Sequence, residues 1–96
     1  MQIIKLEVGQ RPHDDSDCIR IEETEDGSFA LTGTALCEKD EDTESVTLVE
    51  TRHFETMSEA EDAGLVWANA QQVKVIHVGY GTLAKPMALT EVDRPL

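Results

Sequence analysis

The chain has 96 residues, 20 acidic and 8 basic side chains, and a formal net charge of −12. This length supports one domain with a modest core. The charge argues against direct binding to DNA or RNA, because phosphates repel carboxylates. No apolar run is long enough to cross a bilayer, and charges interrupt residues 1–8, where a secretory signal is apolar. The sequence therefore predicts a cytoplasmic protein without a membrane span.

The N-terminal residues predict a strand followed by a loop. Residues 2–8 alternate between apolar and polar side chains, which is typical of a half-buried strand. Residues 9–17 contain Gly, Pro and several acids without periodicity, so they predict a loop.

Residues 18–36 predict a β-hairpin around Glu25-Asp26-Gly27. A two-residue turn would mix polar and apolar side chains on both faces. A three-residue turn places Ile21 opposite Leu31 and gathers the apolar side chains on one face. Because burial sets the register of a strand pair, we expect the three-residue turn, with Gly27 in its left-handed position.

The following segment predicts an acidic loop and then a strand. Residues 37–45 are dominated by acids and indicate a surface loop. Residues 45–53 predict a strand whose apolar residues fall on both faces, so we expect a bulge near Val49. Phe54 then leads toward the helix and caps one end of the core.

A helix is predicted from about residue 58 to residue 72. Ser58 and Glu61 form a capping-box pattern, and Thr56 with Glu59 offers the same box two residues earlier. The predicted sheet-facing stripe is small except for Trp67, which we expect to anchor the core; it comprises Ala60, Ala63, Gly64, Trp67, Ala70 and Gln71. Leu65 falls on the opposite side.

Residues 73–78 have apolar side chains at both odd and even positions, so they predict an inner strand covered on both faces. A turn at residues 79–81 is expected to break this strand. Residues 82–85 suit a short return strand. We expect residues 1–85 to form a single domain and residues 86–96 an extended C-terminal arm. The β-β-β-β-α-β order predicts an α+β fold, with about five strands in an antiparallel or mixed sheet and one helix packed on one face.

The hairpin, the strand into Phe54, the Glu-Ala-Glu helix start and the apolar strand ending in a glycine turn form a combined pattern over about residues 18–85. This pattern resembles small bacterial single-helix α+β domains of unknown function. The resemblance implies the same fold and brings no active site, catalytic residue or cofactor.

The acidity is local, since residues 14–44 contain 12 acids and 2 bases while the rest of the chain is nearly neutral. This distribution favours an interaction or regulatory module that binds a basic protein partner, with imitation of a nucleic-acid backbone as a variant. The predicted partner-binding residues are Asp14, Asp15, Asp17, Glu22, Glu25, Asp26, Asp40, Glu41, Asp42 and Glu44.

Two alternatives stay open. A small metal-dependent enzyme would use His13, Asp14, Asp17 and His77, although residues 13–17 lack the spacing of a built metal site. The other alternative is a homodimer formed through an edge strand or Leu65. The acids at residues 40–44 lack the glycine and frame of a calcium loop. Cys18 and Cys37 predict free thiols, because the expected register places them on opposite faces.

Overall fold

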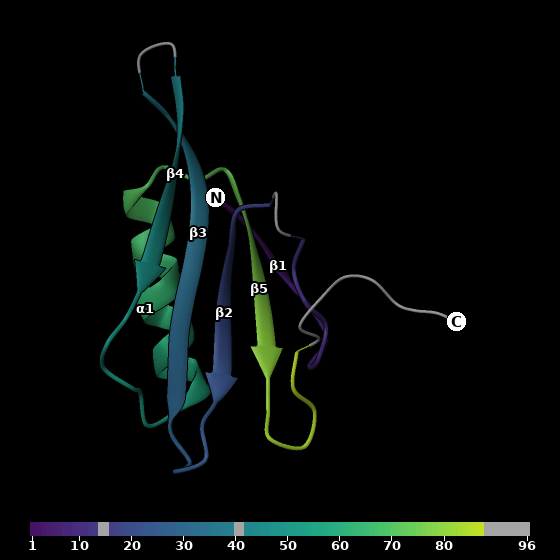
Figure 1. Ribbon diagram of the computed structural model, residues 1–96. Helices are drawn as coiled ribbons and strands as arrows, with labels where there is room; N and C mark the ends of the chain where they lie inside the picture. Colours follow the sequence, from purple (N-terminus) through teal and green to yellow (C-terminus); the bar gives the residue numbers. More distant parts are fainter. Residues whose placement is uncertain (14–15, 40–41, 88–96) are drawn as a thin grey trace.

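Five strands and one helix follow one another in the order predicted from the sequence (Figure 1). The computed structural model describes residues 1–13, 16–39 and 42–87, with the backbone alone for residues 37–39 and 42–44. The elements are β1 (Gln2–Lys5), β2 (Cys18–Glu23), β3 (Phe29–Lys39), β4 (Asp42–Val49), α1 (Met57–Ala70) and β5 (Val75–Gly81). They form an α+β fold with a mixed sheet covered by α1 on one face.

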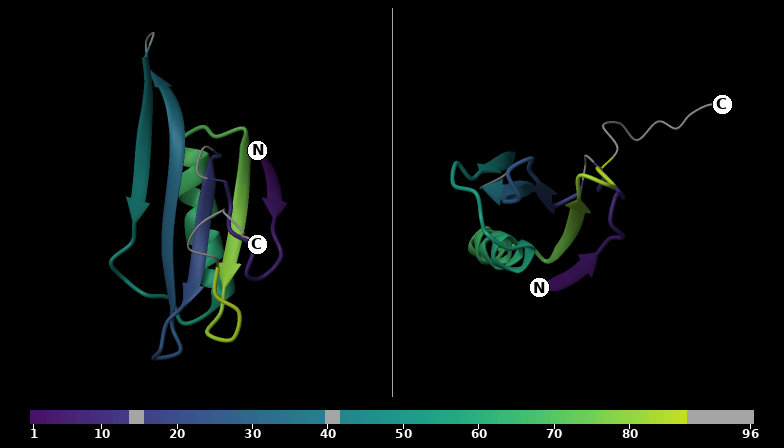
Figure 2. Two further views of the ribbon diagram at one scale, coloured as in Figure 1. Left: turned by 45° about the vertical axis from the view of Figure 1, so that its right-hand side comes forward. Right: turned by 90° about the horizontal axis from the view of Figure 1, so that it is seen from below.

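The strands lie in the order β1-β5-β2-β3-β4. β2 and β4 are antiparallel to β3, whereas β5 runs parallel to both of its neighbours, β1 and β2. After β4 the chain therefore crosses the sheet through α1, and β5 lies between β1 and β2, two strands that come earlier in the sequence. Figure 2 shows the sheet curling around the helix in the view from below.

The predicted register of the first hairpin is confirmed. Ile21 pairs with Leu31 and Cys18 with Thr34. Gly27 has a φ of +84°, in the left-handed region that glycine occupies without steric cost. The hairpin therefore places its apolar residues on the face that α1 covers.

Small helix residues bring α1 close to the sheet. Ala60, Gly64 and Ala68 are its buried members. A Cβ atom on Gly64 would lie 2.6 Å from Ile19 Cδ1, so the helix backbone sits almost directly on β2. The buried sheet residues of this core are Ile19, Ile21, Leu31, Ala35, Ile76, Val78 and Tyr80.

Trp67 packs against the core but is not the buried anchor that the sequence predicts. Trp67 is half-buried and covers Gly33, whose Cβ would lie 3.0 Å from the indole ring. The buried face of α1 is also rotated relative to the predicted stripe, because Ala68 is buried and Ala70 is exposed. Leu65 is half-buried and packs against the core instead of facing away from it.

The ends of α1 follow local signals in the sequence. Thr56 is the N-cap, and its hydroxyl accepts a hydrogen bond of 3.1 Å from the backbone N–H of Glu59. The helix therefore begins with the capping box of Thr56 and Glu59, and not with that of Ser58 and Glu61. Gln71 is the C-cap, as expected, and Gln72 has a φ of 61° at the reversal into β5.

The prediction that Gly79-Tyr80-Gly81 breaks the last strand is wrong, because β5 continues to Gly81. The two glycines accommodate chain segments packed on the face opposite α1. A Cβ on Gly79 would lie 2.8 Å from the ring of Pro12, which is fully buried, and one on Gly81 would lie 3.1 Å from the backbone nitrogen of Met87. Residues 82–85 form a turn and not a return strand, with Thr82 N–H bonded to the Lys85 carbonyl.

The acidic loop expected at residues 37–45 is instead the end of a second hairpin, in which Lys39 pairs with Asp42. Backbone pairing does not require apolar side chains, and strands at a sheet edge tolerate charge. β4 ends at Val49, before the predicted end at residue 53, and its register with β3 is continuous, so the bulge expected near Val49-Glu50 does not lie within the strand. The irregularity comes after Glu50, because the pairing resumes at Phe54 with Phe29, two residues out of register. Val49 is 68% exposed on the face away from α1.

β1 is shorter than the predicted strand over residues 2–8, and it lies at the sheet edge beyond β5. Asp14, Asp15, Asp40, Glu41 and nearly all of the predicted C-terminal arm fall outside the described residues. In the described part of the chain, no helix has both the length and the apolar character needed to cross a bilayer.

Candidate interaction surface

The predicted partner-binding acids fall at two ends of the sheet. Glu25 and Asp26 lie in the turn between β2 and β3, whereas Asp42 and Glu44 lie at the start of β4, at the opposite end of β3 (Figure 1). β3 has 11 residues, and a strand rises roughly 3.4 Å per residue, so the two groups are separated by about 35 Å. Glu22 is exposed on β2, on the face away from α1.

Asp17 has a structural position beside the sheet. Its carboxylate accepts a hydrogen bond of 2.9 Å from the backbone N–H of Leu36 on β3. Its carbonyl accepts one of 2.9 Å from the N–H of His77 on β5. Asp17 therefore joins two strands that lie on either side of β2, which accounts for an acid at this position without a partner molecule.

Asp26 organises the turn between β2 and β3. One carboxylate oxygen accepts hydrogen bonds from the Ser28 hydroxyl at 2.6 Å, from the Ser28 N–H at 3.1 Å and from the Thr24 hydroxyl. The Ser28 and Thr24 hydroxyls, followed by the Ser28 N–H, lower the pKa of Asp26 to about 2. Asp26 is exposed, so its carboxylate stays charged and accessible while it holds the turn.

His53 completes this turn network, because its Nδ1 lies 3.1 Å from the Ser28 hydroxyl oxygen. A catalytic serine donates its proton to the histidine. Here the Ser28 proton is directed to Asp26, so the His53 Nδ1–H donates to Ser28. The arrangement resembles a nucleophile and base in its residue types, but the hydrogen bonds run in the direction that stabilises a turn.

An open hollow lies beside this network, where the segment after β4 meets the start of α1. Its volume is about 490 Å³, and it is lined by Arg52, His53, Phe54, Glu55, Glu59, Asp62 and Ala63. The Arg52 guanidinium lies 4.8 Å from the centre of the Phe54 ring. Three exposed carboxylates therefore border the hollow, and none of them was among the predicted site residues.

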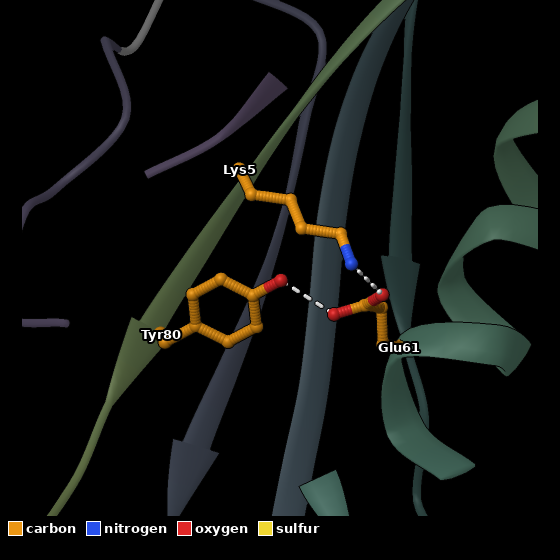
Figure 3. Close-up of polar contacts among 3 residues, drawn as sticks. All are labelled: Lys5, Glu61 and Tyr80. Atoms are coloured by element: carbon orange, nitrogen blue, oxygen red, sulfur yellow. Dashed lines mark hydrogen bonds and ion pairs between the residues drawn. The ribbon is translucent and has the colours of Figure 1, made fainter. Parts of the chain in front are cut away.

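Figure 3 shows a polar contact between α1 and the parallel strands that the sequence did not predict. The Tyr80 hydroxyl donates a hydrogen bond to Glu61 Oε1, and Lys5 Nζ lies 3.1 Å from Glu61 Oε2. Burial of the phenol, together with the neighbouring Glu61 carboxylate, raises the pKa of Tyr80 well above its usual range. A phenol held in its neutral form acts here as a hydrogen-bond donor that links β5 to α1.

The residues of the metal-site hypothesis are only partly described. His13 is exposed, His77 is half-buried on β5, and Asp17 reaches His77 through its backbone carbonyl. Over residues 1–13, 16–39 and 42–87, no group of three His, Cys, Asp or Glu side chains is placed to hold a metal ion. Asp14 lies outside these ranges.

Cys18 is a free, fully buried thiol, with its sulfur 3.5 Å from the Thr34 hydroxyl oxygen. A nucleophilic cysteine needs access to a substrate, so this position is that of a core residue. The side chain of Cys37 is outside the described part of the structure.

Together, these observations define a small α+β domain with one helix on a mixed sheet and with acidic residues near both ends of that sheet. No family model, no curated protein and no solved structure matches the chain.

Proposed function

We propose that this protein is a small acidic interaction module that binds a basic protein partner. One observation supports the proposal above the others: exposed carboxylates are spread over several elements, and only three of those in the described part border the hollow. The exposed acids in the described part are Glu7, Glu22, Glu25, Asp26, Glu55, Glu59 and Asp62. The exposed bases there are Lys5, Arg52, Lys74 and Lys85.

Such a surface attracts cationic partners at long range and speeds their association. Because exposed charges are screened over about 8–10 Å in ordinary buffers, binding through them weakens as salt is added. The fold supplies the rigid support: Glu22 stands on β2, Asp26 on a tight hydrogen-bonded turn, and Asp62 on α1.

Two matched double variants test this function. Glu22→Gln/Glu25→Gln removes two charges near the turn between β2 and β3, and Glu55→Gln/Asp62→Asn removes two beside the hollow. The immobilised wild type is expected to retain basic proteins from a lysate at low sodium chloride and to release them at high sodium chloride. At least one double variant is expected to retain less.

The two variants change the net charge equally, so a difference between them locates the binding face. Retention that persists at high salt, or that is equal for the wild type and both variants, would contradict the proposal. Circular dichroism of each variant controls for folding.

A further inference from the structure

We infer that the basic partner contributes an extended segment, which adds to the sheet as a further strand beside β4. This inference rests on the proposed function and names the mode of binding. The described residues place β4 at the sheet edge with β3 as its neighbour. Addition of a strand to such an edge uses main-chain hydrogen bonds for affinity and side chains for specificity.

The hydrogen bonds show which backbone groups of β4 face outward. The Glu50 N–H donates to the Leu31 carbonyl at 3.2 Å, and these residues continue the register of β4 with β3. Along an antiparallel strand, residues bonded to one neighbour alternate with residues whose N–H and C=O point the other way. Val46 and Leu48 therefore bond to β3, and Ser45, Thr47 and Val49 direct their N–H and C=O away from it.

These three outward-directed residues are also exposed through their side chains. They stand on the face opposite α1, across from Leu36, Thr34 and Thr32 of β3. Leu36 is 52% exposed and Val49 is 68% exposed. β-branched and apolar side chains of an added strand find suitable cross-strand neighbours on such a surface.

The other sheet edge is a poorer site for a basic segment. Gln2 and Leu6 donate to the Lys74 and Val78 carbonyls, at 2.8 and 2.9 Å. The outward-directed residues of β1 are therefore Ile3 and Lys5. This edge is four residues long and includes a lysine, whereas β4 has eight residues.

Charge decides which occupant fits β4. The outer stretch, Ser45 to Val49, has none of the Pro or Lys residues that protect many edges from pairing. Asp42, Glu44 and Glu50 flank it, and the hollow beyond its end is bordered by Glu55, Glu59 and Asp62. A second copy of this chain would add another −12 charge, so an extended segment rich in Lys or Arg is favoured over self-pairing.

A proline substitution tests the edge selectively. Because the Thr47 N–H points away from β3, Thr47→Pro removes an outward donor and leaves the β3–β4 hydrogen bonds in place. Ile3→Pro makes the matched change on the outer edge of β1. The probe is a short, fluorescently labelled peptide of alternating Lys and Val, capped at both ends and followed by anisotropy at low and high salt.

Thr47→Pro is expected to weaken peptide binding about tenfold or more, since it removes a main-chain contact and obstructs close approach, and Ile3→Pro is expected to leave binding unchanged. The same peptide with N-methyl groups on alternate residues keeps its charge and loses donors, so it is expected to bind the wild type more weakly. This arm does not depend on the folding of a variant. Amide exchange adds a direct readout: the peptide is expected to slow exchange at Ser45, Thr47 and Val49.

The outcomes separate the two proposals. Strand addition is overturned if the peptide binds in a salt-sensitive way, if Thr47→Pro and N-methylation leave its affinity unchanged, and if it does not slow amide exchange at Thr47. This result would leave the proposal of an acidic interaction module intact. Absence of binding for the peptide and for basic proteins at low salt overturns both. A dimer in ultracentrifugation that Thr47→Pro dissolves would assign the edge to a second copy and overturn the basic occupant.

Discussion

The Tyr80 hydroxyl donates a hydrogen bond to the Glu61 carboxylate and so joins β5 to α1. Tyr80 is 9% exposed, and the same carboxylate holds Lys5 of β1 through its second oxygen. The helix α1 packs mainly on β2 and β3, so this polar link ties it to the other half of the sheet as well. Its loss would leave the partly buried Glu61 carboxylate with Lys5 as its remaining partner in this cluster, and Lys5 is largely exposed.

Tyr80→Phe is expected to lower the free energy of unfolding by about 1.5–3 kcal/mol, the range for a hydrogen bond to a charged group. Lys5→Gln is the comparison, because it removes the exposed partner of the same carboxylate. An exposed ion pair contributes about 0–1 kcal/mol, so Lys5→Gln is expected to lower stability less. Urea unfolding measures both variants, and equal losses would show that the phenol has no special role.

The same phenol predicts a loss of stability in alkali. Burial and Glu61 raise the pKa of Tyr80 in the folded protein, whereas an unfolded tyrosine titrates near pH 10. Above that pH the unfolded chain releases a proton that the folded protein retains, so the free energy of unfolding falls as pH rises. Tyr80→Phe is expected to flatten this decline. Comparing Lys5→Gln with the double variant Lys5→Gln/Tyr80→Phe separates the effect of the phenol from that of the lysine. If stability falls equally with pH in the wild type and in Tyr80→Phe, the prediction is contradicted.

Local and periodic features of this fold could be predicted from the sequence. The pairing of Ile21 with Leu31 followed from burial, because a shift of one residue would have exposed half the apolar side chains. The start of the helix follows from a capping-box pattern, and its end near residues 71–72 follows from the β-branched, apolar stretch that comes next. Each of these features depends on residues that are close together in the chain.

Features that depend on distant segments could not be read in this way. Gly79 signals a turn in isolation, but it belongs to a strand because Pro12 occupies the space where a side chain would stand. The link from Tyr80 to Glu61 requires the insertion of β5 between β1 and β2, which no local pattern encodes. The hollow beside Arg52 likewise forms only when α1 folds back beyond β4.

The lowered pKa of Asp26 predicts a loss of folding stability in acid. Its pKa is about 2 in the folded protein, below the ordinary value of 3.8, so its stabilising effect is present above the ordinary value and is lost as pH falls toward the folded one. Asp26→Asn is expected to make unfolding less dependent on pH between about pH 4 and 2. Glu25→Gln removes a neighbouring exposed charge in the same turn and serves as the control. Thermal melts across this range check the prediction, which fails if both variants follow the wild-type curve.

Gly64 provides a test of the close contact between α1 and the sheet. Alanine is favoured over glycine within a helix by about 0.8–1 kcal/mol, so propensity alone predicts that Gly64→Ala is stabilising. The added Cβ, however, would lie 2.6 Å from Ile19 Cδ1 and 3.1 Å from Leu31 Cδ1. Because overpacking of a core costs about 1–3 kcal/mol, we expect a net loss of stability, followed through Trp67 fluorescence in urea.

Two further variants show whether contact with Ile19 causes that loss. Ile19→Val removes the nearest methyl group, so the double variant with Gly64→Ala is expected to be more stable than the sum of the two single changes predicts. Asn69→Ala places alanine at an exposed position of the same helix and is expected to leave stability unchanged or slightly higher. A Gly64→Ala protein that is more stable than the wild type would mean that α1 lies farther from β2 than the structure shows.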